Sequence, residues 1–229
     1  MSRLLAIETS AESCSVALEI GGEQRERFEH APMKHAELLL PMVSSLLAEG
    51  GIRASDLDAI AFGRGPGSFT SVRIGIGVVQ GLAWGAEVGV VPVSSLAAVA
   101  QGVVGSLTTS DPLPQIVVAM DARMQEVFHA AFTVGDDGLV REAGEESVSA
   151  PSDVTVHEPW VAAGNGFDRY DELRMLAEGA EQCLADTWPR AASVLALARH
   201  WLLSNEPLSA GLAQPVYIRN DVAQKPASV

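Results

Sequence analysis

Apolar and polar positions follow one another in short blocks along this chain, and the blocks predict strands that alternate with helices. Residues 4–8 and 57–62 are short apolar runs typical of buried strands, and residues 14–20 alternate as a third strand. Residues 34–49 and 68–84 have the period of helices. Further strands are predicted at 24–29, 88–93, 140–149 and 161–163, and further helices at 94–104 and 191–203. The pattern therefore predicts an α/β fold.

The second half of the chain partly repeats the first. Residues 115–121 predict a strand that ends in Asp121, and a short turn leads to a second strand at 126–132. Glu8 ends the first strand in the same way, 113 positions earlier. We therefore expect a duplicated fold with an N-terminal domain over 1–109 and a C-terminal domain over 110–229.

Two of the predicted helices carry more hydrophobic surface than one sheet face can cover. The apolar residues of helix 34–49 span about 200° of the helical wheel, twice the stripe that a surface helix needs. Helix 68–84 is apolar on two sides, beside a stripe formed by Gly77, Gly81 and Gly85. The second cover is another helix of this chain or of a partner, and the glycines allow it to approach closely.

The residues that we assign to a partner surface are Leu39, Met42, Leu46, Ile74, Gly77, Val78 and Gly81. A patch of this kind left bare on a monomer favours aggregation. Packing helix against helix with a related chain gives a four-helix seam, so the patch allows a homodimer as well as a heterodimer. Within helix 34–49, Pro41 predicts a kink or a late helix start.

A glycine-rich turn at 63–70 links a predicted strand to the second of these helices. Strand, turn and helix N-terminus present free backbone N–H groups, and such a corner can hold an anion. A tight turn without a ligand explains the spacing equally well. The residues of candidate phosphate or nucleotide loops are Glu8, Thr9, Gly65, Gly67 and Asp121. The alternative role of the two acids is turn capping by a side-chain oxygen.

Composition and charge narrow the class of protein. The 229 residues are 48% hydrophobic, which supports a substantial core, and no apolar run reaches the roughly 18 residues of a membrane span. The formal net charge of −14 predicts repulsion of nucleic acid unless a partner supplies positive surface. Cys14 and Cys183 form no redox or metal motif, and Glu8 comes too early for a signal peptide. We expect a cytoplasmic protein with two free thiols.

Several stretches taken together resemble the TsaB family, also called YeaZ. The matching stretches are residues 4–9, 14–18, 63–77, 121–124 and 215–219. The resemblance implies an actin-like, ribonuclease H-like fold of two related α/β domains. It also implies a platform subunit that binds TsaD, the transferase that attaches a threonylcarbamoyl group to tRNA, together with the ATPase TsaE. In this family, tRNA binding is expected only through the complex, and a homodimer is expected without TsaD.

The chain departs from its active relatives at the positions that carry their chemistry. TsaD relatives bind metal through two histidines four residues apart, and Ser95 and Val99 stand at those places here. Serine and valine are not a plausible pair of ligands for a divalent metal. Kinases of this fold class use Asp where this chain has Glu8, and the glycine-rich phosphate turn after it is absent. We therefore expect no catalytic residue, no metal and no cofactor.

Two other interpretations of the sequence stay open. One is an active ATP-binding phosphotransferase or metallopeptidase of the same fold class. The other is a homodimer with a separate regulatory role. Metal content and ATP turnover of the isolated protein separate the first of these from the platform subunit.

Overall fold

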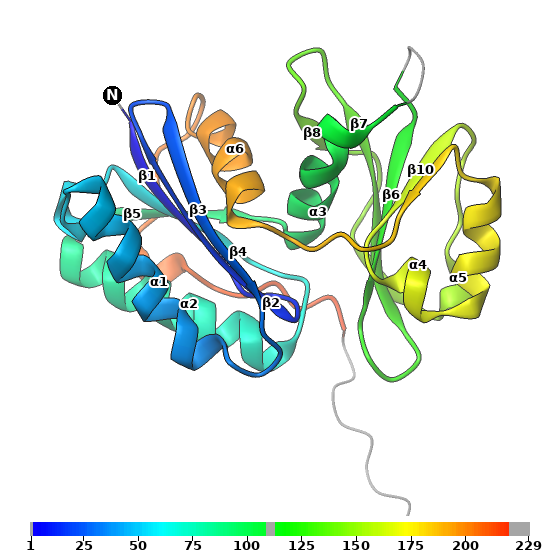
Figure 1. Ribbon diagram of the computed structural model, residues 1–229, viewed down its shortest axis with the longest axis horizontal. Coiled ribbons are helices and arrows are strands. Elements are labelled where there is room, and N and C mark those ends of the chain that lie inside the picture. Colours follow the sequence, from blue (N-terminus) through cyan, green and yellow to red (C-terminus); the bar gives the residue numbers. More distant parts are fainter. Residues whose placement is uncertain (1, 109–112, 220–229) are drawn as a thin grey trace, which may run out of the picture.

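Two sheets, each flanked by helices, form two lobes that lie side by side (Figure 1). The computed structural model describes residues 2–108 and 113–219. The first sheet has the strand order β3-β2-β1-β4-β5. Its strands are β1 (Arg3–Glu8), β2 (Ser13–Ile20), β3 (Glu23–His30), β4 (Ala59–Gly63) and β5 (Gly89–Val93). The central strand β1 is antiparallel to β2 and parallel to β4.

The second sheet repeats this arrangement. Its order is β8-β7-β6-β10-β11, with β9 paired to β7, and its central strand β6 is antiparallel to β7 and parallel to β10. Its strands are β6 (Gln115–Asp121), β7 (Val127–Val134), β8 (Val140–Glu142), β9 (Ser147–Ser149), β10 (Trp160–Ala163) and β11 (Gln182–Leu184). Corresponding strands occupy corresponding places, so the prediction of a duplicated α/β fold is confirmed.

The helices do not all pack on the sheet of their own half of the chain. They are α1 (His35–Gly50), α2 (Phe69–Ala86), α3 (Ser95–Val103), α4 (Gly166–Arg169), α5 (Asp171–Leu176) and α6 (Ala191–Trp201). Short 3₁₀ turns are Ala54–Asp56, Val104–Ser106, Pro151–Asp153, Ala177–Gly179 and Ala210–Leu212. Helices α1 and α2 cover one face of the first sheet, whereas α6 covers its other face. Helix α3 packs on the second sheet.

The alternation of side chains along β1 explains this layered core. Leu5 and Ile7 point toward α1 and α2, while Leu4 and Ala6 point toward α6. A strand that is covered on both faces reads as a continuous hydrophobic run, as β1 does. Each lobe therefore includes a helix from the other half of the sequence. The predicted domain boundary at 109/110 falls outside the described residues, and the division into sequence halves stays a prediction.

The secondary structure differs from the prediction in three places. Helix α1 begins at His35 and continues through Pro41, so the expectation of a late start was wrong. Proline has no N–H to donate to the carbonyl four residues earlier, but Pro41 lies on the exposed side of the helix, where water can bind that carbonyl. The strand predicted at 140–149 is two short strands, and α4, α5 and β11 were not predicted. In the part of the chain that the structure describes, no helix has the length and hydropathy of a membrane span.

Candidate functional site

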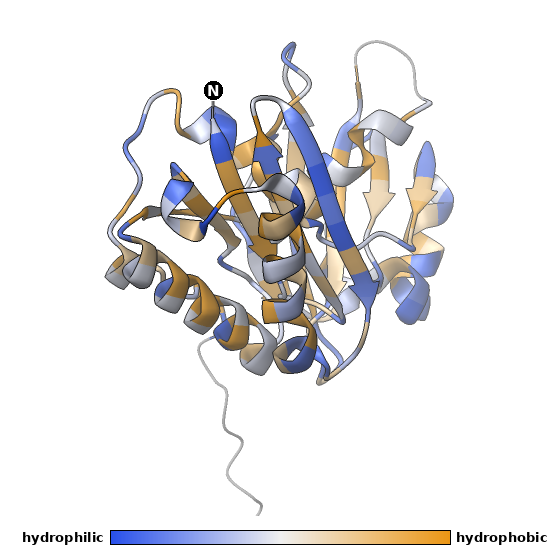
Figure 2. Ribbon diagram, turned by 60° about the vertical axis from the view of Figure 1, so that its left-hand side comes forward, coloured by the Kyte–Doolittle hydropathy of each residue, from blue (hydrophilic) through white to orange (hydrophobic). Residues whose placement is uncertain are grey.

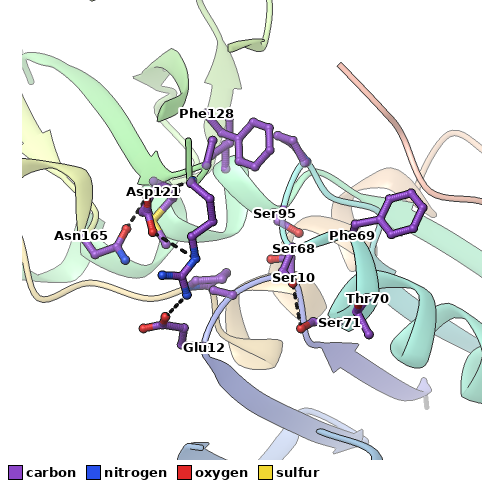
Figure 3. Close-up of a pocket in the computed structure, with 18 of the residues that line it drawn as sticks. Ser10, Glu12, Ser68, Phe69, Thr70, Ser71, Ser95, Asp121, Phe128 and Asn165 are labelled. Carbon is purple, nitrogen blue, oxygen red and sulfur yellow. Dashed lines mark hydrogen bonds and ion pairs between the residues drawn. The ribbon is translucent and has the colours of Figure 1, made fainter. Parts of the chain in front are cut away.

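A cleft of about 510 Å³ lies between the lobes, where the carboxyl ends of β1 and β6 approach each other. Figure 3 shows Glu12 and Asp121 at one side of this cleft, and Ser10, Ser68 and Ser71 grouped at the other. Its walls come from the turn after β1, the glycine-rich turn, the turn after β6 and the C-terminal residues 216–219. Residues far apart in the sequence thus meet at one site, where Asp121 lines the cleft.

Glu8 is sealed inside the first lobe beside the cleft. Its carboxylate accepts hydrogen bonds from the Ser10 backbone N–H at 2.6 Å and from the Ser95 hydroxyl at 2.8 Å. A Cβ atom at position 63 would lie only 1.9 Å from Glu8 Oε2, so the glycine makes room for the acid. Burial raises the pKa of Glu8 above its ordinary value, against the opposing effect of these hydrogen bonds. Glu8 therefore braces the β1 end and does not face a ligand.

The turn after β1 and the glycine-rich turn are packed against each other. Thr9 donates its hydroxyl to the Ser71 carbonyl at 2.9 Å, and Ser68 N–H donates to the Ser10 carbonyl at 2.7 Å. A Cβ at Gly67 would lie 2.4 Å from that same carbonyl. Of the candidates for phosphate binding, the Thr9 hydroxyl is thus used inside the chain, and Gly67 packs tightly against the turn after β1. The contacts favour a structural role for both turns.

Gly65 has a φ of 90°, a left-handed conformation that favours glycine. Its carbonyl accepts a hydrogen bond from Ser95 N–H at 2.9 Å. The neighbouring Arg64 carbonyl accepts from Val216 N–H at 2.9 Å, so the C-terminal residues lie directly on this turn. The turn thus contacts both the start of α3 and the C-terminal segment around Val216.

Asp121, which corresponds to Glu8 in the repeat, has a different environment. Arg169 donates to Asp121 Oδ2 at 2.6 Å, and Tyr170 donates its hydroxyl to Oδ1 at 2.6 Å. The Arg123 backbone N–H also donates to Oδ1, at 2.9 Å. Burial, followed by the bond to Asp121, raises the pKa of Tyr170 to about 12. Asp121 is therefore the centre of an ionic cluster in the second lobe.

Ion pairs from this cluster and from a second site connect the lobes. Arg123 pairs with Glu12 of the first lobe, and Arg169 lies 3.8 Å from the same carboxylate. At another point, Arg64 pairs with Glu146 at 2.9 Å. The sequence analysis missed these partners because nothing local links positions so far apart. The only local signal was the placement of Arg123 two residues after a strand-end acid.

The residues at the TsaD metal positions do not fit a metal here. Ser95 is buried and donates to Glu8, and Val99 is buried in the core beneath α3. Within residues 2–108 and 113–219, no group of three or more histidine, cysteine or carboxylate residues could hold an ion. The described site can offer shape, apolar walls and hydrogen bonds, but the cations Arg123 and Arg169 already have carboxylate partners.

The predicted partner residues occupy two different depths. Leu39 and Leu46 are completely buried against the first sheet, so assigning them to an outer surface was wrong. Met42, Ile74 and Val78 are partly buried against the same core. Helical periodicity identified two apolar faces of α1, but only packing shows which one meets the sheet.

The outer face of α2 is exposed and consists of Phe69, Arg73, Gly77, Gly81 and Trp84. No atom within 4 Å would obstruct a Cβ at Gly77 or Gly81. Trp84 is 78% exposed, and Leu40 on the neighbouring helix α1 is 49% exposed. Figure 2 shows hydrophobic residues along these two helices, which pack side by side. The glycine stripe therefore lies at the surface, between large hydrophobic side chains.

Comparisons with known proteins all point to the same family. The model of the TsaD family, described as tRNA N6-adenosine threonylcarbamoyltransferase, matches residues 29–223. A protein of Escherichia coli K12 named tRNA threonylcarbamoyladenosine biosynthesis protein TsaB is 37% identical, covering 97% of each chain. Its namesake from Haemophilus influenzae is 36% identical and covers 97% of this chain and 95% of the relative.

A solved structure shows the same fold over the same length. YeaZ from Pseudomonas aeruginosa aligns with a TM-score of 0.84 and 41% sequence identity. The alignment covers 95% of this chain and 100% of that one. The two lobes and their mixed sheets are thus shared with this relative, and the fold of the chain is the actin-like, ribonuclease H-like α/β fold.

Proposed function

The chain belongs to the TsaB family of tRNA threonylcarbamoyladenosine biosynthesis proteins, and we propose that it serves this modification as a non-catalytic subunit. In this proposal it binds and supports a TsaD-like transferase, together with a TsaE-like ATPase, in the cytoplasm. Without the transferase it forms a homodimer. It requires no cofactor of its own, and it meets tRNA only through the complex.

The absence of a catalytic role is supported by how the candidate loops are used. Glu8 and Thr9 hold the turn after β1 to α3 and α2, through Ser95 and the Ser71 carbonyl. Asp121 is neutralised by Arg169 and hydrogen-bonded by Tyr170. A general base or a phosphate ligand needs a group that is free to meet the substrate. Glu8 and Thr9 face the chain itself, and Asp121, which lines the cleft, is already held by Arg169 and Tyr170.

The outer face of α2 carries the proposal of a partner surface. Glycine in an exposed helix costs about 1 kcal/mol relative to alanine, so the exposed Gly77 and Gly81 need a reason beyond the stability of this chain. Close approach of a second helix provides one. Arg73 and Trp84 along the same face are residue types that commonly dominate binding energy, and Phe69 is of a type enriched at interfaces.

A TsaD-like subunit fits this surface because it shares the fold. The TsaD family model matches most of this chain, so such a partner would carry helices that correspond to α1 and α2. Packing the two pairs face to face gives a pseudo-symmetric seam, and a second copy of this chain can form the same seam. The net charge of −14 disfavours direct contact with tRNA and fits delivery by a partner.

Replacing Gly81 with leucine tests this surface. The leucine has open space in the isolated chain and removes a helix-destabilising glycine, so Gly81→Leu should fold with a free energy of unfolding up to about 1 kcal/mol higher. It should weaken binding to the TsaD-like subunit at least about thirtyfold, measured by titration calorimetry, and abolish the homodimer in size-exclusion chromatography.

The matched control is Gly179→Leu. Gly179 also has open space around it, but it lies in the second lobe, after α5. This variant should bind with wild-type affinity. A folded Gly81→Leu protein that binds and dimerises like the wild type places the interface elsewhere.

A further inference from the structure

The last described residues of the chain, 214–219, form a strap that runs from the first lobe across the edge of the cleft to the second lobe. The strap follows Ala213, which is buried in the core beneath α2. Val216 N–H donates to the Arg64 carbonyl, and Ile218 packs into the core of the second lobe. Residues 216–219 line the cleft. One short segment thus contacts both lobes and the space between them.

The strap also completes the outer face of α2. Arg73 Nε donates to the Tyr217 hydroxyl at 2.7 Å, and the Arg73 guanidinium lies 3.5 Å from the centre of the Phe69 ring. The Phe69 and Tyr217 rings are 5.7 Å apart. Among the described residues, Arg73 has no carboxylate within salt-bridge distance. This exposed cluster therefore combines Phe69 and Arg73 of α2 with Tyr217 of the strap.

At its other end, the strap holds the turn between β6 and β7, which lines the cleft. Arg219 pairs with Glu126 and donates to the Ala122 carbonyl at 3.1 Å. The turn between β6 and β7 carries Arg123, which pairs with Glu12 across the cleft. Arg123, Met124 and Gln125 all have positive φ angles, so external contacts must help to keep this turn in place.

We propose that the strap couples partner binding on α2 to closure of the cleft. This inference rests on the proposed function, because it takes the TsaD-like subunit as the molecule that covers Phe69, Arg73 and Tyr217. A partner seated on this cluster fixes Tyr217, and the contacts of Ile218 and Arg219 with the second lobe then restrain the β6–β7 turn. Linkage makes the effect reciprocal, so a closed cleft strengthens partner binding by the same factor.

The test is hydrogen exchange of residues 119–128, which include the β6–β7 turn, with and without a saturating TsaD-like subunit. In the wild type, the partner should slow exchange both in α2 and in this segment, by about threefold or more. In Tyr217→Ala the partner should still protect α2, with affinity reduced about tenfold, but the protection of 119–128 should disappear. Free Tyr217→Ala should also exchange this segment faster than the free wild type.

Leu203→Ala is the control, because it removes a large exposed side chain at the end of α6, outside the strap and α2. It should behave like the wild type in every arm. If the wild type binds and Tyr217→Ala still protects 119–128 fully, the coupling is wrong while the proposed function stands. If the wild type does not bind the TsaD-like subunit at all, the proposed function fails and the coupling fails with it.

Discussion

Glu8 and Asp121 end the central strands of the two sheets, and their surroundings have little in common. Glu8 is 1% exposed and is held by a hydroxyl and a backbone N–H, with no cation in direct contact among the described residues. Asp121 is bound by Arg169 and faces Arg123, which links it to Glu12 of the other lobe. The same position in a repeated fold thus carries Glu8, which stabilises one lobe internally, and Asp121, which is the centre of ion pairs between the two lobes.

The difference follows from what each lobe packs around its acid. Helix α3 begins with Ser95 directly against Glu8, and β4 ends in a glycine that leaves space for a buried carboxyl group. In the second lobe, α4 and the residue that follows it bring Arg169 and Tyr170 to Asp121. A duplicated backbone therefore conserves the position of an acid, while the neighbouring helices decide whether that acid is buried or paired.

The largest effect should come from Gly63→Ala. Its methyl group would overlap Glu8 Oε2, and the Ser95 hydroxyl lies 2.8 Å from the same point, so neither neighbour can yield cheaply. We expect a loss of about 3 kcal/mol in the free energy of unfolding, measured by urea denaturation. Adding Glu8→Ala removes the clash, so the double variant should lose clearly less than the sum of the single losses.

Gly179→Ala serves as the reference, since it has open space and should change stability by no more than about 0.5 kcal/mol. A Gly63→Ala protein as stable as this reference contradicts the idea that Glu8 depends on the missing side chain.

A smaller loss should follow from Asp121→Asn. The amide keeps the shape of the acid but gives up two charge-assisted hydrogen bonds, to Arg169 and Tyr170. Since Arg169 is 41% exposed, solvent screening reduces the loss to about 1–2 kcal/mol. Asp171→Asn, whose acid pairs with Arg174 but is 86% exposed, should cost less than about 0.5 kcal/mol. Equal losses in the two variants, measured by urea denaturation, count against an ionic centre at Asp121.

The smallest effect should be that of Glu8→Gln, and its sign should depend on pH. The folded protein holds the Glu8 proton more tightly than the unfolded chain, because burial raises the pKa of Glu8 above 4.5. The stability that this proton contributes is full below the unfolded pKa and is lost as pH rises through the folded pKa. Glutamine does not ionise; its one amide oxygen can keep the bond from Ser10 N–H, while its NH₂ group can only donate toward the Ser95 hydroxyl. Its stability relative to the wild type should therefore increase between pH 4 and pH 8 in urea titrations, and a constant difference contradicts a buried, desolvated carboxyl group.

Local pattern predicted much of the fold. Short apolar runs identified β1, β4 and β6, and helical periodicity identified α1 and α2 close to their observed ends. The strand–turn–strand repeat indicated the duplication. Each of these signals depends on neighbours within a few residues, which is why the sequence alone reveals them. Helices α4 and α5 were missed because they are only four and six residues long.

The proposed partner surface could be predicted only in part from the local sequence pattern. Two apolar faces on a helix predict two covers, and the structure has open space beside Gly77 and Gly81. Leu39 and Leu46 pack against the sheet, and the large hydrophobic side chain that α1 exposes is Leu40 instead. Arg73 and Tyr217, separated by 144 positions, meet only in the folded chain.

By itself, the sequence determined that an acid ends each central strand, that a glycine-rich turn follows β4, and that two helices carry excess hydrophobic surface. These features are written in the spacing of nearby residues. Only the tertiary structure decided that Glu8 is buried and Asp121 is paired, that α3 and α6 pack on the sheets of opposite halves, and that the C-terminal strap joins α2 to the cleft. Burial and ion pairing depend on groups brought together from distant positions, and the energy of a carboxylate changes more with those neighbours than with its place in the chain.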